Sequence, residues 1–194
     1  MNLARYAGAA MCWLLFGAPA AAAEPQLIVD ESTVYYPVFG RDREELMRSL
    51  RVPGAGGIER APHGLTRSDF QIDNEFVQDN GRCQVRRLTI RLNVRIDLPR
   101  WDDASPVPTA MREDWRLISE RTARHEGLHR QNALDAAQDL VRALRERPAD
   151  AACADLTRAI RRETNRVRSR WELRDNLLDQ RDVLRLPARP AQRR

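Results

Sequence analysis

The chain contains no lysine, so all 33 of its basic residues are arginine, and they face 28 acidic residues for a formal net charge of +5. Aromatic residues make up only 6% of the sequence and do not alternate with the arginines in a basic stripe. Nucleic-acid-binding surfaces need such a stripe or patch. The sequence therefore predicts no nucleic-acid partner.

Histidine and cysteine are also scarce, with three of each. Cys12 lies in an N-terminal segment that has Arg5 at its start, an apolar run over residues 7–20 and three alanines before Glu24. This order is typical of a secretory signal peptide, which we predict to be residues 1–23. No later run approaches the roughly 18 apolar residues of a membrane span. We therefore expect a periplasmic or secreted protein with no retained membrane span and, once Arg5 is removed, a net charge of 5 − 1 = +4.

Export leaves Cys83 and Cys153 as the only cysteines. An even pair in an oxidising compartment is most simply a disulfide, which would close a loop of about 70 residues. The remaining length suits one domain, predicted to be residues 24–186. The proline- and arginine-containing residues 187–194 are expected to be a disordered tail.

Strand patterns dominate the first half of the mature chain. Residues 27–29 and 34–38 predict an early strand or two, and residues 41–51 a short helix. Residues 70–76 and 85–98 alternate apolar and polar side chains around Asp79-Asn80-Gly81, which predicts a β-hairpin with one face on the core. Pro99 is expected to end the second strand.

Helical periodicity dominates the second half. Apolar residues at steps of three and four predict one helix from about Thr109 to Arg145 and another from about Cys153 to Asp182. The predicted fold class is α+β, with an N-terminal antiparallel β-hairpin or meander packed on two long C-terminal helices.

The first long helix carries His125-Glu126-Gly127-Leu128-His129, an H-E-x-x-H sequence. Residues four apart share a helix face, so both imidazoles can reach one ion, here one Zn²⁺. Glu126 lies between them and can act as general base toward a water molecule that the metal activates. The sequence therefore predicts a zincin-like H-E-x-x-H helix with His125 and His129 as metal ligands and Glu126 as the catalytic residue.

Several segments in order resemble a bacterial family of predicted secreted zinc-dependent proteases, which is also classed as a domain of unknown function. The resemblance rests on residues 35–40 (Tyr-Tyr-Pro-Val-Phe-Gly), 64–66 (Gly-Leu-Thr), 98–101 (Leu-Pro-Arg-Trp), the H-E-x-x-H sequence and Cys153. It implies a metallopeptidase-like helical site and a peptide or protein substrate. Family members end the last helix with Tyr-Asp followed shortly by Thr, His and Gly, whereas residues 178–184 here keep the Asp as Asp179 and lack the His.

A catalytic zinc site normally has three protein ligands, so one is missing from the H-E-x-x-H pair. Resemblance points to Asp179 of the last helix. Helical geometry instead favours carboxylates within about 60° of that helix's apolar stripe and places Asp179 farther off. The candidates left open are Asp179, Asp175, Asp182 and Glu163 on the last helix, His63 in a preceding loop, and Asp135, which lies six residues after His129 in a segment too helical to turn.

Two functions remain at this point. The first is a secreted or periplasmic zinc metallopeptidase that hydrolyses peptide bonds with zinc-activated water and Glu126 as general base. The alternative is a non-catalytic periplasmic binding or scaffold protein with a degenerate zinc site, which the missing histidine of the last helix favours.

Overall fold

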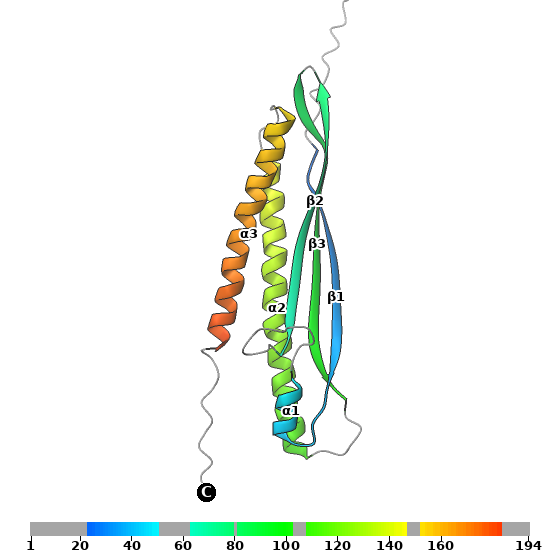
Figure 1. Cartoon of the computed structure of the whole chain (residues 1–194), viewed down its shortest axis with the longest axis vertical. Helices are drawn as coiled ribbons and strands as arrows, with labels where there is room; N and C mark the ends of the chain where they lie inside the picture. Colours follow the sequence, from blue (N-terminus) through cyan, green and yellow to red (C-terminus); the bar gives the residue numbers. More distant parts are fainter. Residues whose placement is uncertain (1–22, 51–62, 80, 103–107, 147–151, 184–194) are drawn as a thin grey trace, which may run out of the picture.

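The computed structural model describes residues 23–50, 63–79, 81–102, 108–146 and 152–183. Strands and helices run side by side along the long axis of the molecule (Figure 1). The predicted signal peptide, apart from Ala23, and the predicted tail over residues 187–194 lie outside these ranges. The elements in chain order are β1 (Gln26–Val38), α1 (Arg43–Ser49), β2 (Leu65–Asp79), β3 (Arg82–Trp101), α2 (Thr109–Arg145) and α3 (Cys153–Val183).

The three strands form one sheet in the order β1-β3-β2. Strands β2 and β3 pair antiparallel, so the predicted hairpin is confirmed, and Gly81 in its turn has a φ of 77° that glycine adopts readily. Strand β1 instead pairs parallel to β3, from Gln26 beside Thr89 to Val38 beside Trp101. The sheet is therefore mixed, and the expectation of an all-antiparallel hairpin or meander is wrong for β1. The residues between β1 and β3 are numerous enough for the crossover that a parallel pair requires.

Pro99 does not end β3, which continues to Trp101. Proline removes a ladder donor and is tolerated only where one side of a strand has no partner. Among the described residues, β2 pairs with β3 only as far as Asp97, so Pro99 has a strand neighbour there on the β1 side alone, where it pairs with Tyr36. The central strand has become an edge at this point, and the proline costs no hydrogen bond to β2.

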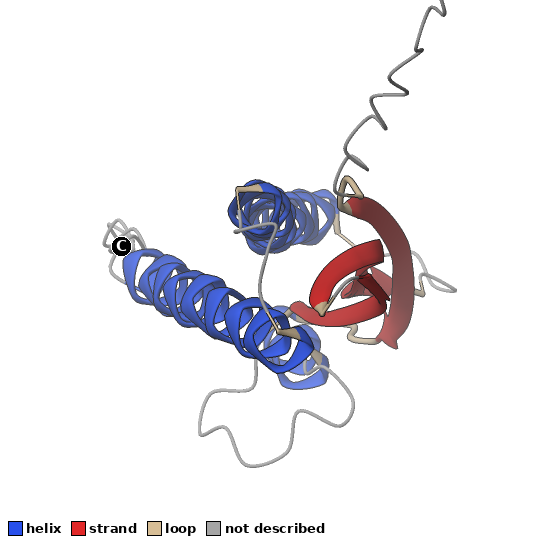
Figure 2. Cartoon of the chain, turned by 90° about the horizontal axis from the view of Figure 1, so that it is seen from above, coloured by secondary structure: helices blue, strands red, loops and turns tan. Residues whose placement is uncertain are grey.

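Strand β3 changes the face that it buries between Val94 and Asp97. From Leu88 to Val94 the even-numbered apolar side chains are buried, whereas Asp97 and Pro99 are buried beyond it. β-Sheets twist along their strands, and a strand as long as β3 can therefore turn opposite faces toward the two ends of a long helix. The sheet is strongly curved when it is seen along the molecule's long axis (Figure 2). The helices pack on the sheet through two separate apolar clusters.

The larger cluster joins β2, β3, α2 and α3 and includes Leu92, Ala133, Leu140 and Leu156. The smaller one joins β1, α1 and the first turns of α2, through Val38, Leu46 and Met111. Helix α2 contributes to both. Its segment between them carries four buried polar residues, at one turn after another: Thr122, Glu126, His129 and Asn132.

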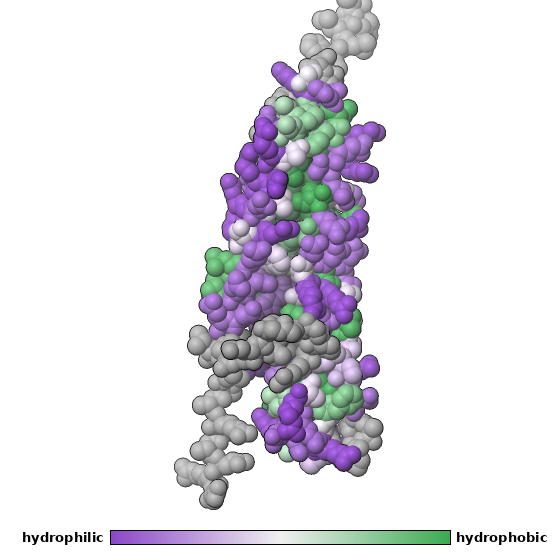
Figure 3. Space-filling model, in the orientation of Figure 1, coloured by the Kyte–Doolittle hydropathy of each residue, from purple (hydrophilic) through white to green (hydrophobic). Residues whose placement is uncertain are grey.

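Helix α3 packs beside α2 and is joined to the sheet by a disulfide between Cys83 and Cys153, whose Cα atoms are 5.0 Å apart. The predicted disulfide is thus present, and the α+β class with two long C-terminal helices is confirmed. The observed bounds of α2 and α3 match the predicted ones to within a residue, and α1 is shorter by two residues at each end than the predicted helix over residues 41–51. Hydrophilic side chains cover most of the face seen in Figure 3. Among the helices that the structure describes, none combines the length and the apolar character needed to cross a membrane.

Candidate metal centre

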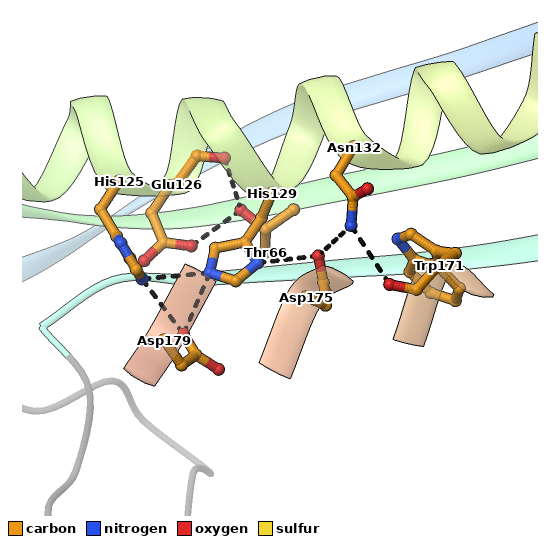
Figure 4. A network of polar contacts seen from close by, with 8 residues as sticks. All are labelled: Thr66, His125, Glu126, His129, Asn132, Trp171, Asp175 and Asp179. Atoms are coloured by element: carbon orange, nitrogen blue, oxygen red, sulfur yellow. Dashed lines mark hydrogen bonds and ion pairs between the residues drawn. The ribbon is translucent and has the colours of Figure 1, made fainter. Parts of the chain in front are cut away.

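The two histidines of the H-E-x-x-H sequence point the same way from α2 (Figure 4). Their ring centroids are 4.6 Å apart with the rings 80° to each other, and their Nε2 atoms are 3.0 Å apart. His129 is buried, and His125 is half-buried. The predicted sharing of one helix face is therefore observed.

Asp179 of α3 completes a group of three. Its Oδ1 lies 3.2 Å from Nε2 of His125 and 3.1 Å from Nε2 of His129. These three residues could hold a metal ion. Four tetrahedral ligands at the Zn–N and Zn–O distances of about 2.0–2.1 Å lie about 3.3–3.4 Å apart. The observed spacing is shorter by only a few tenths of an ångström, so the arrangement fits an ion of this size.

Asp179 is the position that resemblance indicated and that helical geometry disfavoured. The geometric argument assumed that α3 keeps one stripe against α2 along its whole length. The contacts instead pass through Trp171, Asp175 and Asp179, which are four residues apart, and each such step rotates the contact line by about 40°. A line that rotates in this way is expected for helices that cross at an angle.

The other candidates lie elsewhere. Glu163 pairs with Arg166 on its own helix, and Asp135 accepts a hydrogen bond from Gln131. The side chain of Asp182 lies outside the described part of the chain. His63 is half-buried in the turn before β2 and does not belong to the group of three. Burial and, secondly, the charge of Arg121 lower the pKa of His63.

Asp175 contacts the same histidine from its other side. Its Oδ1 lies 3.0 Å from Nδ1 of His129 and accepts a 2.7 Å hydrogen bond from Asn132, whose amide also reaches the carbonyl of Trp171 at 3.3 Å. The indole nitrogen of Trp171 is the one buried side-chain polar atom without a partner among the described residues.

The protons of this group argue for a cation. A carboxylate only accepts, so the imidazole proton of neutral His129 belongs on Nδ1, facing Asp175, and Nε2 presents a lone pair. That lone pair faces Oδ1 of Asp179, a second acceptor, 3.1 Å away. Two acceptors at this distance need a proton or a metal ion between them. Burial lowers the pKa of His129, but the hydrogen bond to Asp175 and the charges of Asp175, Asp179 and Glu126 outweigh it and raise that pKa.

Glu126 is 4% exposed and accepts a 2.8 Å hydrogen bond from the hydroxyl of Thr66 on β2. Gly64 lies against it so closely that a Cβ there would be 2.7 Å from Cγ of Glu126 and 2.7 Å from Cγ2 of Thr122. Burial raises the pKa of Glu126, the Thr66 hydrogen bond and the charges of both histidines lower it, and the charge of Asp179 raises it; the net direction is up. A carboxylate with a raised pKa is a better proton acceptor near neutral pH.

The sequence interpretation did not identify these supports. Thr66 and Gly64 belong to the segment over residues 64–66 that contributed to the family resemblance, but no residue pattern assigned them to Glu126. Asn132 lies in the segment that was expected to be too helical to turn, and α2 does continue through it.

Tyr36 of β1 completes the neighbourhood. Its hydroxyl donates a 2.5 Å hydrogen bond to the backbone carbonyl of His63, immediately before Gly64. Burial first, and then the charges of Glu126 and Asp97, raise the pKa of Tyr36 to about 12. The hydroxyl therefore remains a donor and holds the turn that covers Glu126.

A family model described as "Bacterial protein of unknown function (DUF922)" matches residues 33–183. The match includes all of the residues of the centre and both cysteines of the disulfide, Cys83 and Cys153. Its description names no activity, so the protease character implied by the resemblance stays a prediction. No curated protein and no solved structure matches the chain.

Proposed function

The chain belongs to a bacterial family of unknown function, DUF922, and because that membership supplies no activity, we propose one from the site: an exported, zinc-dependent peptidase. In this proposal His125, His129 and Asp179 hold one Zn²⁺, Glu126 is the general base, and the substrate is a peptide or protein. The convergence of two imidazole nitrogens and one carboxylate oxygen at 3.0–3.2 Å carries the proposal.

The donor set is chemically suited to zinc. Imidazole nitrogen and carboxylate oxygen are both ordinary zinc ligands, and three protein ligands leave one coordination position open for a reactant. A bound zinc ion would supply Lewis acidity, lowering the pKa of a water molecule and polarising a carbonyl oxygen. The remaining work falls to the protein's own groups.

Glu126 is suited to accept the proton of the attacking water and to return it to the leaving amine nitrogen. Its carboxylate stands next to the histidine pair without belonging to the ligand group (Figure 4). Thr66 engages one of its oxygens and Gly64 packs over it, so the carboxylate has a fixed direction before any substrate binds. A base held in place in this way contributes by orientation as well as by its pKa.

A second function is supported by a specific observation, the exposure of Asp179. Its side chain is 62% exposed and lies near the end of the described part of α3. A ligand in that environment exchanges readily with water, as expected of a degenerate site in a non-catalytic periplasmic binding or scaffold protein. The two functions differ in whether zinc is held stoichiometrically and whether it supports turnover.

Metal content and hydrolysis, measured on the same purified protein, separate them. Wild-type protein should hold close to one zinc ion per chain and cleave an unfolded protein substrate such as reduced casein. Glu126→Gln should keep the zinc and lose cleavage, whereas His129→Ala and Asp179→Ala should lose both. Glu120→Gln is the matched control, an exposed carboxylate on the same helix that pairs with Arg116.

Zinc at one ion per chain without any cleavage of casein or periplasmic extract would assign the protein to the scaffold function. Wild-type protein with no zinc under metal-replete conditions at neutral pH would remove the peptidase proposal.

A further inference from the structure

Asp175 lies on the side of His129 that faces away from His125 and Asp179. It meets Nδ1 of His129 at 3.0 Å, while Asp179, one turn farther along α3, meets Nε2 of the same ring at 3.1 Å. The two nitrogens of an imidazole point in nearly opposite directions. Asp175 therefore occupies a place from which it cannot join a metal ion shared by His125 and Asp179, and its role must differ from theirs.

Asp175 is itself held in place. The amide nitrogen of Asn132 donates to Oδ1 of Asp175 at 2.7 Å and to the backbone carbonyl of Trp171 at 3.3 Å. One side chain of α2 is thus hydrogen-bonded to two successive turns of α3. Asn132 is buried, and Trp171 packs edge-on against Phe70 with ring centroids 5.5 Å apart. The carboxylate of Asp175 is thus held by a hydrogen bond to a buried side chain, next to an aromatic pair that packs on the core.

We propose that Asp175 is a positioning residue that fixes the ring of His129 and keeps its proton on Nδ1, so that Nε2 presents its lone pair to a metal ion. This inference rests on the proposed metal site. A carboxylate that accepts from the second nitrogen of a ligating histidine fixes its tautomer and raises its basicity, and removing such a partner typically costs 10–100-fold in metal affinity. The same contact sets the angle at which α3 approaches α2, and so brings Asp179 to its place.

The alternative is that Asp175 only contributes to helix packing. The two roles differ in one respect that can be measured without any metal. A neutral histidine carries its proton on either nitrogen, and the hydrogen bond made by the other nitrogen decides which. If Asp175 governs His129, its removal must change the protonated nitrogen, whereas a packing role would leave the tautomer as it is.

The test uses two variants and a matched control. Asp175→Ala removes both charge and acceptor, and Asp175→Asn keeps an acceptor oxygen without the charge. Glu163→Gln is the control, because Glu163 lies on the same helix, its side chain is 26% exposed against 27% for Asp175, and the change also removes one negative charge. Circular dichroism and thermal unfolding establish that each variant is folded.

Two measurements follow on each protein. The first is the ¹⁵N chemical shift of both His129 nitrogens in metal-free protein, at a pH where the ring is neutral. The second is the dissociation constant for Zn²⁺, obtained by competition with a chromophoric chelator. We expect Asp175→Ala to move the proton to Nε2 and to weaken zinc binding 10–100-fold, Asp175→Asn to keep the proton on Nδ1 with a smaller loss, and Glu163→Gln to match the wild type.

A His129 proton that stays on Nδ1 in folded Asp175→Ala, or zinc binding equal to that of Glu163→Gln, overturns the inference. Should Asp175→Ala fail to fold, the decision falls to Asp175→Asn, for which zinc binding equal to that of the control overturns it. A wild-type protein that binds no zinc defeats the proposed metal site and with it the ligand role of His129. The ¹⁵N shifts then still report whether Asp175 controls the ring, so the two failures are distinguishable.

Discussion

The hydroxyl of Thr66 donates a 2.8 Å hydrogen bond to the carboxylate of Glu126, which joins the first residues of strand β2 to the middle of helix α2. The pair is separated by 60 residues in the chain and connects the sheet to the centre directly. Because Glu126 is 4% exposed, water cannot readily replace this donor.

Replacing Thr66 by valine should destabilise the protein by about 1–3 kcal/mol, since a buried carboxylate loses its hydroxyl donor with little change of shape. The pKa of Glu126 should rise further, because the hydrogen bond from Thr66 lowers it. Thr66→Ser keeps the hydroxyl and serves as control. Urea unfolding at neutral pH measures the difference, and equal stability of the valine and serine variants would show that the bond contributes nothing.

Gly64→Ala should also destabilise, by about 1–3 kcal/mol, because the new methyl group would meet Glu126 and Thr122 at 2.7 Å and force them apart. Gly127→Ala is the matched control on α2, where a Cβ meets nothing within 4 Å. Alanine is a better helix former than glycine, so Gly127→Ala should stabilise by up to about 1 kcal/mol. Thermal unfolding of both variants checks the opposite signs, and a shift of the same sign in both argues against close packing at Gly64.

Replacing Cys83 and Cys153 together by serine should cost about 2–5 kcal/mol, since the bond closes a long loop with a sequence separation of 70. Denaturant unfolding of the variant, compared with untreated and reduced wild-type protein, measures this. Reduced wild type should coincide with the variant. Non-reducing peptide mapping should recover the Cys83–Cys153 peptide pair, and two free thiols in protein isolated from the periplasm would contradict both the bond and the energy.

Tyr36 should ionise late, because its pKa is raised to about 12. The fold thus favours the neutral phenol over the ionised one, relative to an unfolded chain in which the pKa is about 10. The stabilisation is fully present below pH 10 and is lost as pH rises from 10 to about 12. Ultraviolet titration of the phenols should contain a late component that Tyr36→Phe lacks, and the stability advantage of wild type over Tyr36→Phe should shrink over the same interval. A titration that is unchanged by Tyr36→Phe above pH 11 would refute the assignment.

The two long helices and the hairpin could be predicted from the sequence, because each depends on a pattern of neighbouring residues. The steps of three and four over residues 109–145 and 153–182 correspond to α2 and α3, and the alternation on either side of Gly81 corresponds to the hairpin. The disulfide was predicted because only two cysteines remain once the predicted signal peptide is removed. For the centre, the spacing of His125 and His129 placed both on one face, because helix geometry alone determines that relation.

What depends on the relation between distant elements was not predicted. The parallel pairing of β1 with β3 has no local signature, and neither does the change of buried face along β3, which arises from twist accumulated over many residues. Asp97 is one of the polar residues in the alternating segment 85–98, whose apolar face was expected on the core, and it is nevertheless buried beside Arg67 and Arg95. The choice among Asp175, Asp179 and Glu163 required the crossing of α2 and α3, since a helical wheel describes one straight helix and not its angle to another.

The disulfide holds α3 covalently at its first residue, Cys153, whereas Asp179 lies near the other end of the helix. Helices rise about 1.5 Å per residue, so Asp179 lies about 39 Å from that covalent pivot, and a rotation of about 3° would move its carboxylate by about 2 Å, the length of one bond between zinc and oxygen. Asn132 contacts α3 about seven-tenths and about five-sixths of the way from Cys153 to Asp179, at Trp171 and Asp175. The precision of the centre therefore depends on the angular stiffness of one helix. Substitutions far from the histidines that let α3 rotate should lower metal affinity in proportion to the displacement of Asp179 that they permit.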